Sequence, residues 1–201
     1  MPNGPEPPAP SPVTLRAFAH PLRLRLLSLL TGTAMSAAEA ARELGESQAN
    51  VSYHVRRLHE AGLLTLAEEV QVRGGRALRY RHDPASGPAT AHGGAEDLRM
   101  LAAALAEELQ RRSLLRDPEP PRTFTDTEVW VAPEEWAALV ERASELGEEL
   151  HRAARAPRSP GAIPVSASLL FFALRTEGEG DDDGDGGGEG AGDGGDAADR
   201  P

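Results

Sequence analysis

The chain has 201 residues, a formal net charge of −11 and no cysteine. The lack of cysteine excludes disulfides and thiolate metal sites, and no apolar run of the sequence approaches the length of a membrane span. The chain also lacks a basic-then-apolar stretch of the kind that forms a signal peptide. We therefore expect a soluble cytoplasmic protein with no membrane partner.

The charge is distributed unevenly along the chain. Residues 13–82 carry ten Arg and six Glu, a balance of +4, whereas residues 83–201 carry eleven Arg and 25 acids, a balance of −14. A basic segment thus lies inside an acidic chain, and a cluster of positive charge indicates a polyanionic partner such as a nucleic acid.

The first structured segment is predicted to be helical. Residues 1–12 contain six prolines and no core-forming pattern, so we expect a disordered leader there. A helical segment begins at Val13. His20-Pro21 then starts a second helix, because proline suits a first helical turn. Its predicted apolar face consists of Leu22, Leu26, Leu29 and Leu30, and Thr31-Gly32-Thr33 ends it.

Two short helices joined by a glycine turn follow. Ser36 and Glu39 have the spacing of a capping box, and Gly45 ends the first helix. Ser47 is predicted to cap the second helix, and Gly62 to end it. The inward stripe of this second helix is Val51, Val55 and Leu58. Its opposite face carries polar and basic side chains, namely Gln48, Ser52, Tyr53, Arg56 and Arg57.

An arginine-rich hairpin comes next. Residues 63–72 and 77–82 are predicted strands, with Gly74-Gly75 as the turn. Closely spaced like charges on a hairpin favour contact with phosphates. Two short helices and a basic hairpin predict a winged helix-turn-helix domain over residues 13–92. In that fold one helix enters a DNA major groove while the hairpin lies along the backbone.

The next segment is predicted to mediate dimerisation. Residues 84–94 have the composition of a linker, and residues 96–116 form a strongly helical stretch within a dimerisation and linker region, residues 93–122. Its apolar stripe is expected to pack against the same helix of a second subunit, giving a homodimer. The stripe consists of Leu98, Leu101, Leu105 and Leu109.

A second domain is predicted over residues 123–176. Residues 124–131 and 163–174 have strand patterns, and they flank a helix from Pro133 to about Arg155. Together they predict a small β-α-β unit with parallel strands, which makes the whole chain α+β. Trp130 and Trp136 are expected in its core, and lining a small-molecule pocket is the alternative.

The acidic C-terminal tail is predicted to be disordered. Residues 177–201 contain ten Gly and ten acids and have no means of forming a core. A solubilising extension is the simpler interpretation. The alternative is that the tail competes with DNA for the arginine-rich hairpin.

Three stretches together resemble the arsenical-resistance-repressor (ArsR) family of winged-helix regulators: residues 15–27, 47–63 and 75–81. The resemblance covers residues 13–82 and implies a homodimer that binds a pseudo-palindromic operator in double-stranded DNA, acting as a repressor or an activator, with repression favoured. Carried over by position, the DNA-contacting residues are Ser47, Gln48, Asn50, Ser52, Tyr53, His54 and Arg57 on the recognition helix, and Arg73, Arg76 and Arg79 on the wing.

The resemblance does not extend to the family's metal sites. Its metal sensors use a Cys-x-Cys pair, or His and acidic ligands on the dimer helix, and this chain has no cysteine and no His between Glu96 and Arg116. We therefore expect no metal site and no cofactor. A small-molecule effector of unknown chemistry would have to change the spacing of the two recognition helices.

Each predicted contact also has a plainer interpretation. Gln48, Asn50 and Ser52 can be solvated or capping residues, and His54 can be a packed histidine rather than a phosphate ligand. Arg56 or Arg57 can pair with Glu60. At the level of function, the alternative to a DNA-binding regulator is a winged-helix adaptor that binds proteins. We expect no catalytic residues, because no nucleophile motif or phosphate-binding glycine loop occurs in the sequence.

Overall fold

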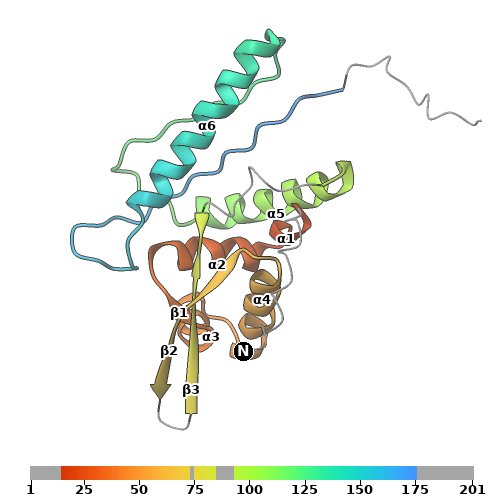
Figure 1. Ribbon diagram of the computed structural model, residues 1–201. Helices are drawn as coiled ribbons and strands as arrows, with labels where there is room; N and C mark the ends of the chain where they lie inside the picture. The colour runs from red at the N-terminus through yellow and green to blue at the C-terminus, as the bar shows by residue number, and fades with distance from the viewer. Residues whose placement is uncertain (1–14, 73–74, 85–92, 176–201) are drawn as a thin grey trace, which may run out of the picture. The chain divides into compact units, whose positions relative to one another are not determined.

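The computed structural model describes residues 15–72, 75–84 and 93–175 (Figure 1). The predicted leader, most of the linker, the wing residue Arg73 and the acidic tail lie outside these ranges. The chain divides into two units, residues 1–169 and 170–201. The described part of the second unit, residues 170–175, has no regular secondary structure.

Two helices open the first unit: α1 (Leu15–Phe18) and α2 (Pro21–Gly32). The predicted start of α2 is confirmed. Nδ1 of His20 accepts a hydrogen bond from the backbone N–H of Leu22 at 3.1 Å, and Pro21 occupies the first turn. The predicted apolar face is confirmed at Leu22, Leu26 and Leu30, and Leu27 is buried as well.

The helix-turn-helix consists of α3 (Ala37–Leu44) and α4 (Gln48–Glu60). The capping box of α3 is confirmed, because Ser36 Oγ accepts from the N–H of Glu39 while the Glu39 carboxylate accepts from the N–H of Ser36 at 2.7 Å. Gly45, with φ 68°, ends α3 in the left-handed conformation. Ser47 caps α4 as predicted.

A three-stranded antiparallel sheet contains the wing, which is the hairpin of its last two strands. It comprises β1 (Met35–Ser36), β2 (Leu64–Val72) and β3 (Gly75–His82), in the order β1-β3-β2. Both strands of the predicted hairpin are confirmed. β1 was not predicted, because two residues are too short to show an alternating pattern. Its pairing places Ser36 beside Arg79, which joins the start of α3 to the wing.

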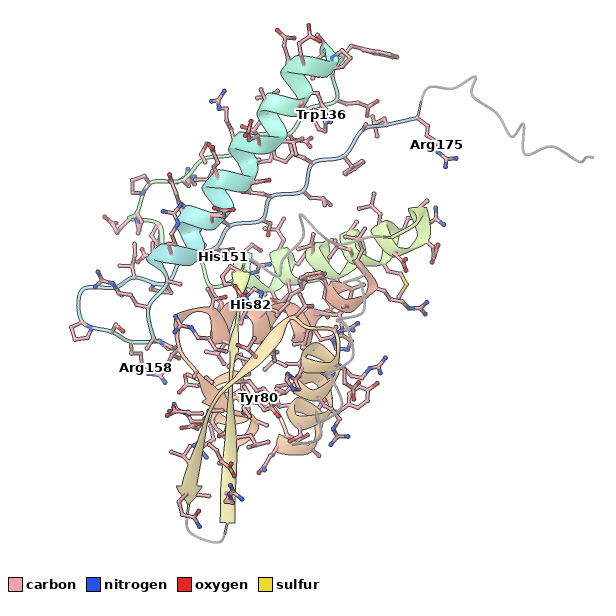
Figure 2. All side chains as sticks on the ribbon, viewed as in Figure 1. Tyr80, His82, Trp136, His151, Arg158 and Arg175 are labelled. Atoms are coloured by element: carbon pink, nitrogen blue, oxygen red, sulfur yellow. The ribbon has the colours of Figure 1, made fainter. Side chains whose placement is uncertain are left out.

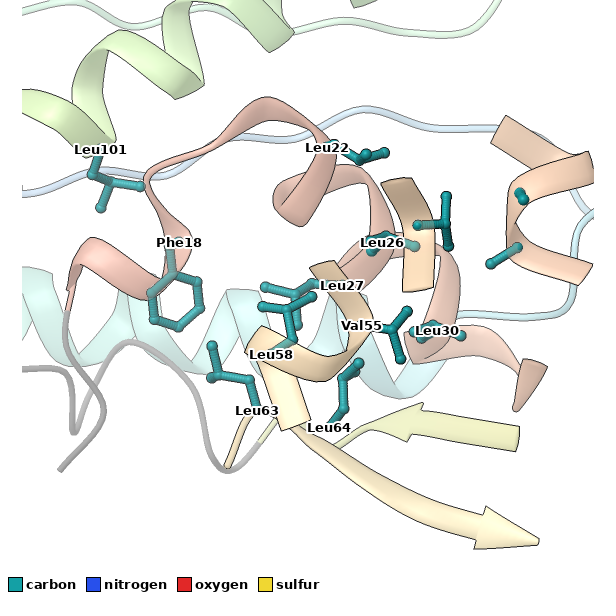
Figure 3. Packing of buried hydrophobic residues seen from close by; sticks show 13 residues of the cluster. Phe18, Leu22, Leu26, Leu27, Leu30, Val55, Leu58, Leu63, Leu64 and Leu101 are labelled. Carbon is teal, nitrogen blue, oxygen red and sulfur yellow. The ribbon is translucent and has the colours of Figure 1, made fainter. Parts of the chain in front are cut away.

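The hydrophobic core is formed by the helices and the first residues of β2. Figure 3 shows side chains of α2, α4 and the β2 entry converging. Leu26, Leu30, Leu58 and Leu63 have no exposed surface. Full burial of each such side chain stabilises the fold by about 1.5–3 kcal/mol. The core therefore fixes the orientation of α4 and of the sheet relative to each other.

Helix α5 (Ala95–Ser113) packs on its own chain. Leu101 and Ala104 are buried, and Leu105 packs against the same cluster as α1 and α2. The sequence placed this helix outside the DNA-binding domain, and in the structure it completes that domain's core instead. Leu98 is half-buried, while Leu109 is 55% exposed.

Helix α6 (Pro133–Ala153) is confirmed, and none of its residues is buried. The two strands predicted on either side of it are wrong: residues 123–132 and 162–175 are described and contain no strand. The physical reason is that a strand requires a hydrogen-bonding neighbour, which an alternating pattern does not supply. The expected core position of Trp130 is also wrong, because its side chain is 89% exposed, and Trp136 is only half-buried.

Within the described part of the chain, each helix is too short or too polar to span a bilayer.

Candidate nucleic-acid interface

The buried stripe of α4 determines which of its side chains face outwards. Val51, Val55 and Leu58 are buried in the core, so the helix has one fixed rotation about its axis. Gln48, Ser52 and Arg56 recur every four residues and therefore share a face. That face is directed towards the wing.

A groove of about 390 Å³ separates α4 from the wing. Its polar side chains come from β1, α4 and β3. The groove is lined by Ser36, Ala37, Ala38, Gln48, Ser52, Val55, Arg56, Val72, Arg76, Ala77, Leu78 and Tyr80. Figure 2 shows Tyr80 on β3, within the same domain. Cations on both sides of a groove suit a phosphate backbone.

Arg56 is the groove residue that the predicted DNA-contact set lacked. It is exposed and lines the groove on the α4 side, opposite Arg76 on β3. The sequence did contain a signal for it, because position 56 follows Gln48 and Ser52 at helical spacing. Of the two arginines considered as partners of Glu60, Arg57 forms the pair, at 3.3 Å.

Arg76 and Arg79 on the wing differ in their solvent exposure and in the number of carboxylates that they bind. Arg76 is 69% exposed and pairs with Glu69. A surface pair of this kind contributes about 0–1 kcal/mol, so an incoming phosphate can replace the carboxylate. Arg79 is 27% exposed and donates to two carboxylates: Nε to Glu39 at 3.2 Å and Nη1 to Glu68 at 2.5 Å. Arg79 therefore fastens the wing to α3.

Glu39 is the centre of this attachment. The backbone N–H of Ser36 lowers the pKa of the Glu39 carboxyl most, and the Ser36 hydroxyl and the Arg79 guanidinium lower it further, against the effect of burial. One carboxylate thus caps α3 and holds β3 at the same time. Both interactions are stronger with the ionised form of the carboxyl.

The other predicted contacts on α4 lie at its exposed N-terminal end. Ser47 is exposed, and its hydroxyl oxygen accepts from the N–H of Asn50 at 3.3 Å. The Asn50 side chain is exposed. Tyr53 is 55% exposed and lies edge-on to His54, with 5.0 Å between the ring centroids. These side chains are accessible to a ligand that approaches the start of α4.

His54 is buried, at 7% exposure, and its ring packs on that of His20 with 4.3 Å between centroids. The geometry supports the packing alternative for this residue. Burial lowers the pKa of both histidines most, Arg23 lowers that of His20 further, and the electrostatic interaction with His20 lowers that of His54 further. Two neutral rings therefore connect the start of α2 to α4.

Arg23 is a further cation beside α4, and no spacing rule pointed to it. Its Nε is buried and has no hydrogen-bond partner among the described residues. Burial lowers the pKa of Arg23 most, and the neighbouring Arg57 adds to the effect. Positive charge is thus concentrated on the α2–α4 surface as well as on the wing.

Comparison with known proteins agrees with this geometry. Residues 18–67 match the model of a family described as a helix-turn-helix domain. No curated protein matches the chain. The matched segment runs from the end of α1 to the first residues of β2, and it contains α3 and α4. The chain therefore carries a helix-turn-helix domain, and its described residues include no cluster of three or more metal-ligating side chains.

Proposed function

We propose that this protein is a sequence-specific DNA-binding transcriptional regulator of the ArsR type, acting as a homodimer on a pseudo-palindromic operator. The observation that carries the proposal is the groove between α4 and the wing. Polar side chains of α4, Gln48 and Ser52, share this groove with cations from two elements, Arg56 and Arg76.

Base recognition is assigned to the N-terminal half of α4. Gln48 and Asn50 carry amides that can bond bidentately to adenine, and each good pair discriminates by about 1–3 kcal/mol. Ser47, Ser52 and Tyr53 are suited to sugar or phosphate contacts at the edge of the same surface. Arg57 can exchange its exposed pair with Glu60 for a phosphate.

Phosphate binding is assigned to Arg56 of α4 and Arg76 of β3, which both line the groove. Arg79 holds the wing in place through Glu39 and Glu68. Arg73 is assigned to the wing by resemblance and lies outside the described residues. Binding by these cations weakens steeply with salt, because each neutralised phosphate releases condensed counterions.

Self-association is required for operator recognition. Two α4 helices reach successive major grooves when they are about 34–36 Å apart. On α5, Leu109 is exposed and Leu98 half-buried, whereas Leu101 and Leu105 contact the core of their own chain. Leu98 and Leu109 therefore offer the larger part of any α5 contact with a second copy. The ArsR resemblance favours repression as the outcome of binding.

Selection of bound fragments from random duplex DNA tests binding and identifies the operator together. The matched comparison uses Arg56→Gln with Arg76→Gln against Arg99→Gln with Arg142→Gln, two exposed arginines of α5 and α6. Titration by fluorescence anisotropy should show a plot of log affinity against log salt that is shallower by about 2 for the groove pair. The control pair should keep the parental slope.

A second variant separates base reading from charge. Gln48→Ala should weaken binding to the selected operator by about 1–3 kcal/mol and relax selectivity at one base position, with an unchanged salt slope. If the parent chain ignores every duplex in dilute buffer, the proposal fails, and a protein-binding adaptor becomes the better description.

A further inference from the structure

A short segment after α6 has the properties of a β-strand without a neighbour. Residues 163–169 are extended, exposed and unpaired by any strand of the described chain. Val165 is 72% exposed and Leu169 45%. Residues 162–174 contain no charged side chain. An apolar strand edge of this kind is usually covered, because its free N–H and C=O groups pair readily with another chain.

The segment is self-complementary about Ala167. On either side of Ala167 stand Ser166 and Ser168, and beyond them Val165 and Leu169. If two copies run antiparallel with Ala167 opposite itself, serine faces serine and valine faces leucine. The smallest side chain then lies on the two-fold axis. A closed two-fold pairing uses the same edge of both chains, so that edge is fully paired in the dimer.

Arg112 of α5 indicates which edge is available. Its Nη1 donates to the Ala167 carbonyl oxygen at 3.4 Å and to Ser166 Oγ at 3.2 Å. In a non-hydrogen-bonded antiparallel pair, the N–H and C=O of the paired residue point away from the neighbouring strand. Ala167 can therefore pair with its counterpart while keeping Arg112. The inter-strand hydrogen bonds then come from Ser166 and Ser168.

Other apolar side chains of residues 123–175 are also left uncovered by the single chain. Phe124 and Trp130 are 86% and 89% exposed, and no residue of α6 is buried. Monomeric proteins rarely expose apolar patches larger than a few hundred Å², and a stable interface covers about 800 Å² per partner. Apolar residues that the single chain leaves uncovered can supply that area.

We propose that residues 165–169 pair antiparallel with the same residues of a second copy, about a two-fold axis at Ala167. The ladder holds the C-terminal regions of the two chains together. The inference deepens the homodimer of the proposed function, and it stands or falls independently of DNA binding.

Cysteine cross-linking tests the register directly, because the chain has no cysteine of its own. Ala167→Cys should form a covalent dimer under mild oxidation. Val165→Cys alone and Leu169→Cys alone should not, since each thiol lies four residues, about 13 Å, from its own copy and a disulfide requires Cα atoms within about 7 Å. A mixture of the last two variants should cross-link as a heterodimer.

Leu114→Cys, at an exposed position 87% accessible, measures collisional cross-linking. The proposal is overturned if Ala167→Cys cross-links no faster than Leu114→Cys. It is also overturned if Val165→Cys and Leu169→Cys each cross-link with themselves, which indicates a parallel ladder. All four positions are exposed, so folding is not at issue.

Sedimentation with the full chain provides the second measurement. Val165→Glu should raise the dimer dissociation constant at least tenfold, because each carboxylate would be desolvated opposite Leu169 of the other copy, and Leu114→Glu should not. DNA binding without the cross-links would reject the ladder alone. Cross-links without DNA binding would reject the regulator alone.

Discussion

Helices α4 and α6 are built alike and used differently. Both are amphipathic, and the sequence shows an apolar stripe on each, which on α6 includes Trp136, Leu139 and Leu150. The stripe of α4, with Val51 and Val55, is entirely buried, while α6 buries no residue. An apolar stripe therefore predicts that one face of a helix will be buried, and it does not identify the partner that buries it.

The two helices differ in where their neighbours lie in the chain. Helix α4 packs against α2, α3 and β2, all close in sequence, so these contacts form within a short segment. Helix α6 is preceded and followed by extended segments that hold no strand pairing in the single chain. The N-terminal region thus has a hydrophobic core within the single chain, and α6 has no buried residue.

The largest expected difference between the regions is in core substitutions. Leu26→Ala removes a side chain with no exposed surface and should lower the free energy of unfolding by about 2–5 kcal/mol. Leu146→Ala, which is the same change on α6 at 48% exposure, should alter it by about 0.5 kcal/mol or less. Urea denaturation of both variants measures the contrast, and equal losses would contradict the proposed division.

Acid should lower the stability of the protein through His82, which lies beside His151 of α6. Figure 2 shows His82 at the end of β3 and His151 on α6, and their ring centroids are 6.0 Å apart. Thr31 Oγ1 donates to the Leu27 carbonyl, so it accepts from Nδ1–H of His82, at 2.9 Å. Nε2 of His82 is buried without a partner among the described residues. Burial first, and His151 second, lower the pKa of His82 to about 4.

In the unfolded chain His82 has a pKa near 6.5, so between pH 6.5 and 4 it is protonated when unfolded and largely neutral when folded. The free energy of unfolding should therefore fall as pH drops from about 6.5 to 4, by on the order of 3 kcal/mol, and level off below. His82→Asn keeps a donor for Thr31 and should flatten this part of the curve. An unchanged slope in that variant would show that other groups, such as His20 and His54, carry the acid sensitivity.

The smallest expected effect concerns the helix caps. Ser36→Ala should cost about 1 kcal/mol in global unfolding, because the cap belongs to the packed region. At the start of α6, Ala132 has no hydroxyl, although its N–H donates to Glu135 at 3.3 Å. Ala132→Ser should raise the helix content by circular dichroism and leave the global midpoint unchanged. A shifted midpoint would show that α6 unfolds together with the core.

Local chemistry accounts for what the sequence predicted well. The capping box of Ser36 and Glu39, the glycine stop at Gly45 and the stripe of α4 depend on neighbours within one or two turns, so a linear pattern contains them. Arg56 was equally predictable as a groove residue, because its helical spacing from Gln48 places it on the same face. The helix-turn-helix and hairpin were therefore predictable at the level of residues.

Long-range pairing accounts for the rest. Glu39 meets Arg79 across forty positions, which no spacing rule encodes, so a wing arginine taken as a DNA contact is held by carboxylates. Leu101 is buried because it packs against apolar side chains of α1 and α2. The prediction of strands around α6 was wrong for a related reason. The alternating patterns are present in the sequence, but no neighbouring strand pairs with these segments in the described chain.

The shared carboxylate of Glu39 has a consequence for binding kinetics. Because it joins the start of α3 to β3, the angle between the hairpin and the helix-turn-helix is set before any ligand arrives. Preorganisation of this kind spares the encounter complex much of its ordering entropy. Duplex capture by this domain should accordingly proceed as a rigid docking event, with a rate governed by electrostatic steering.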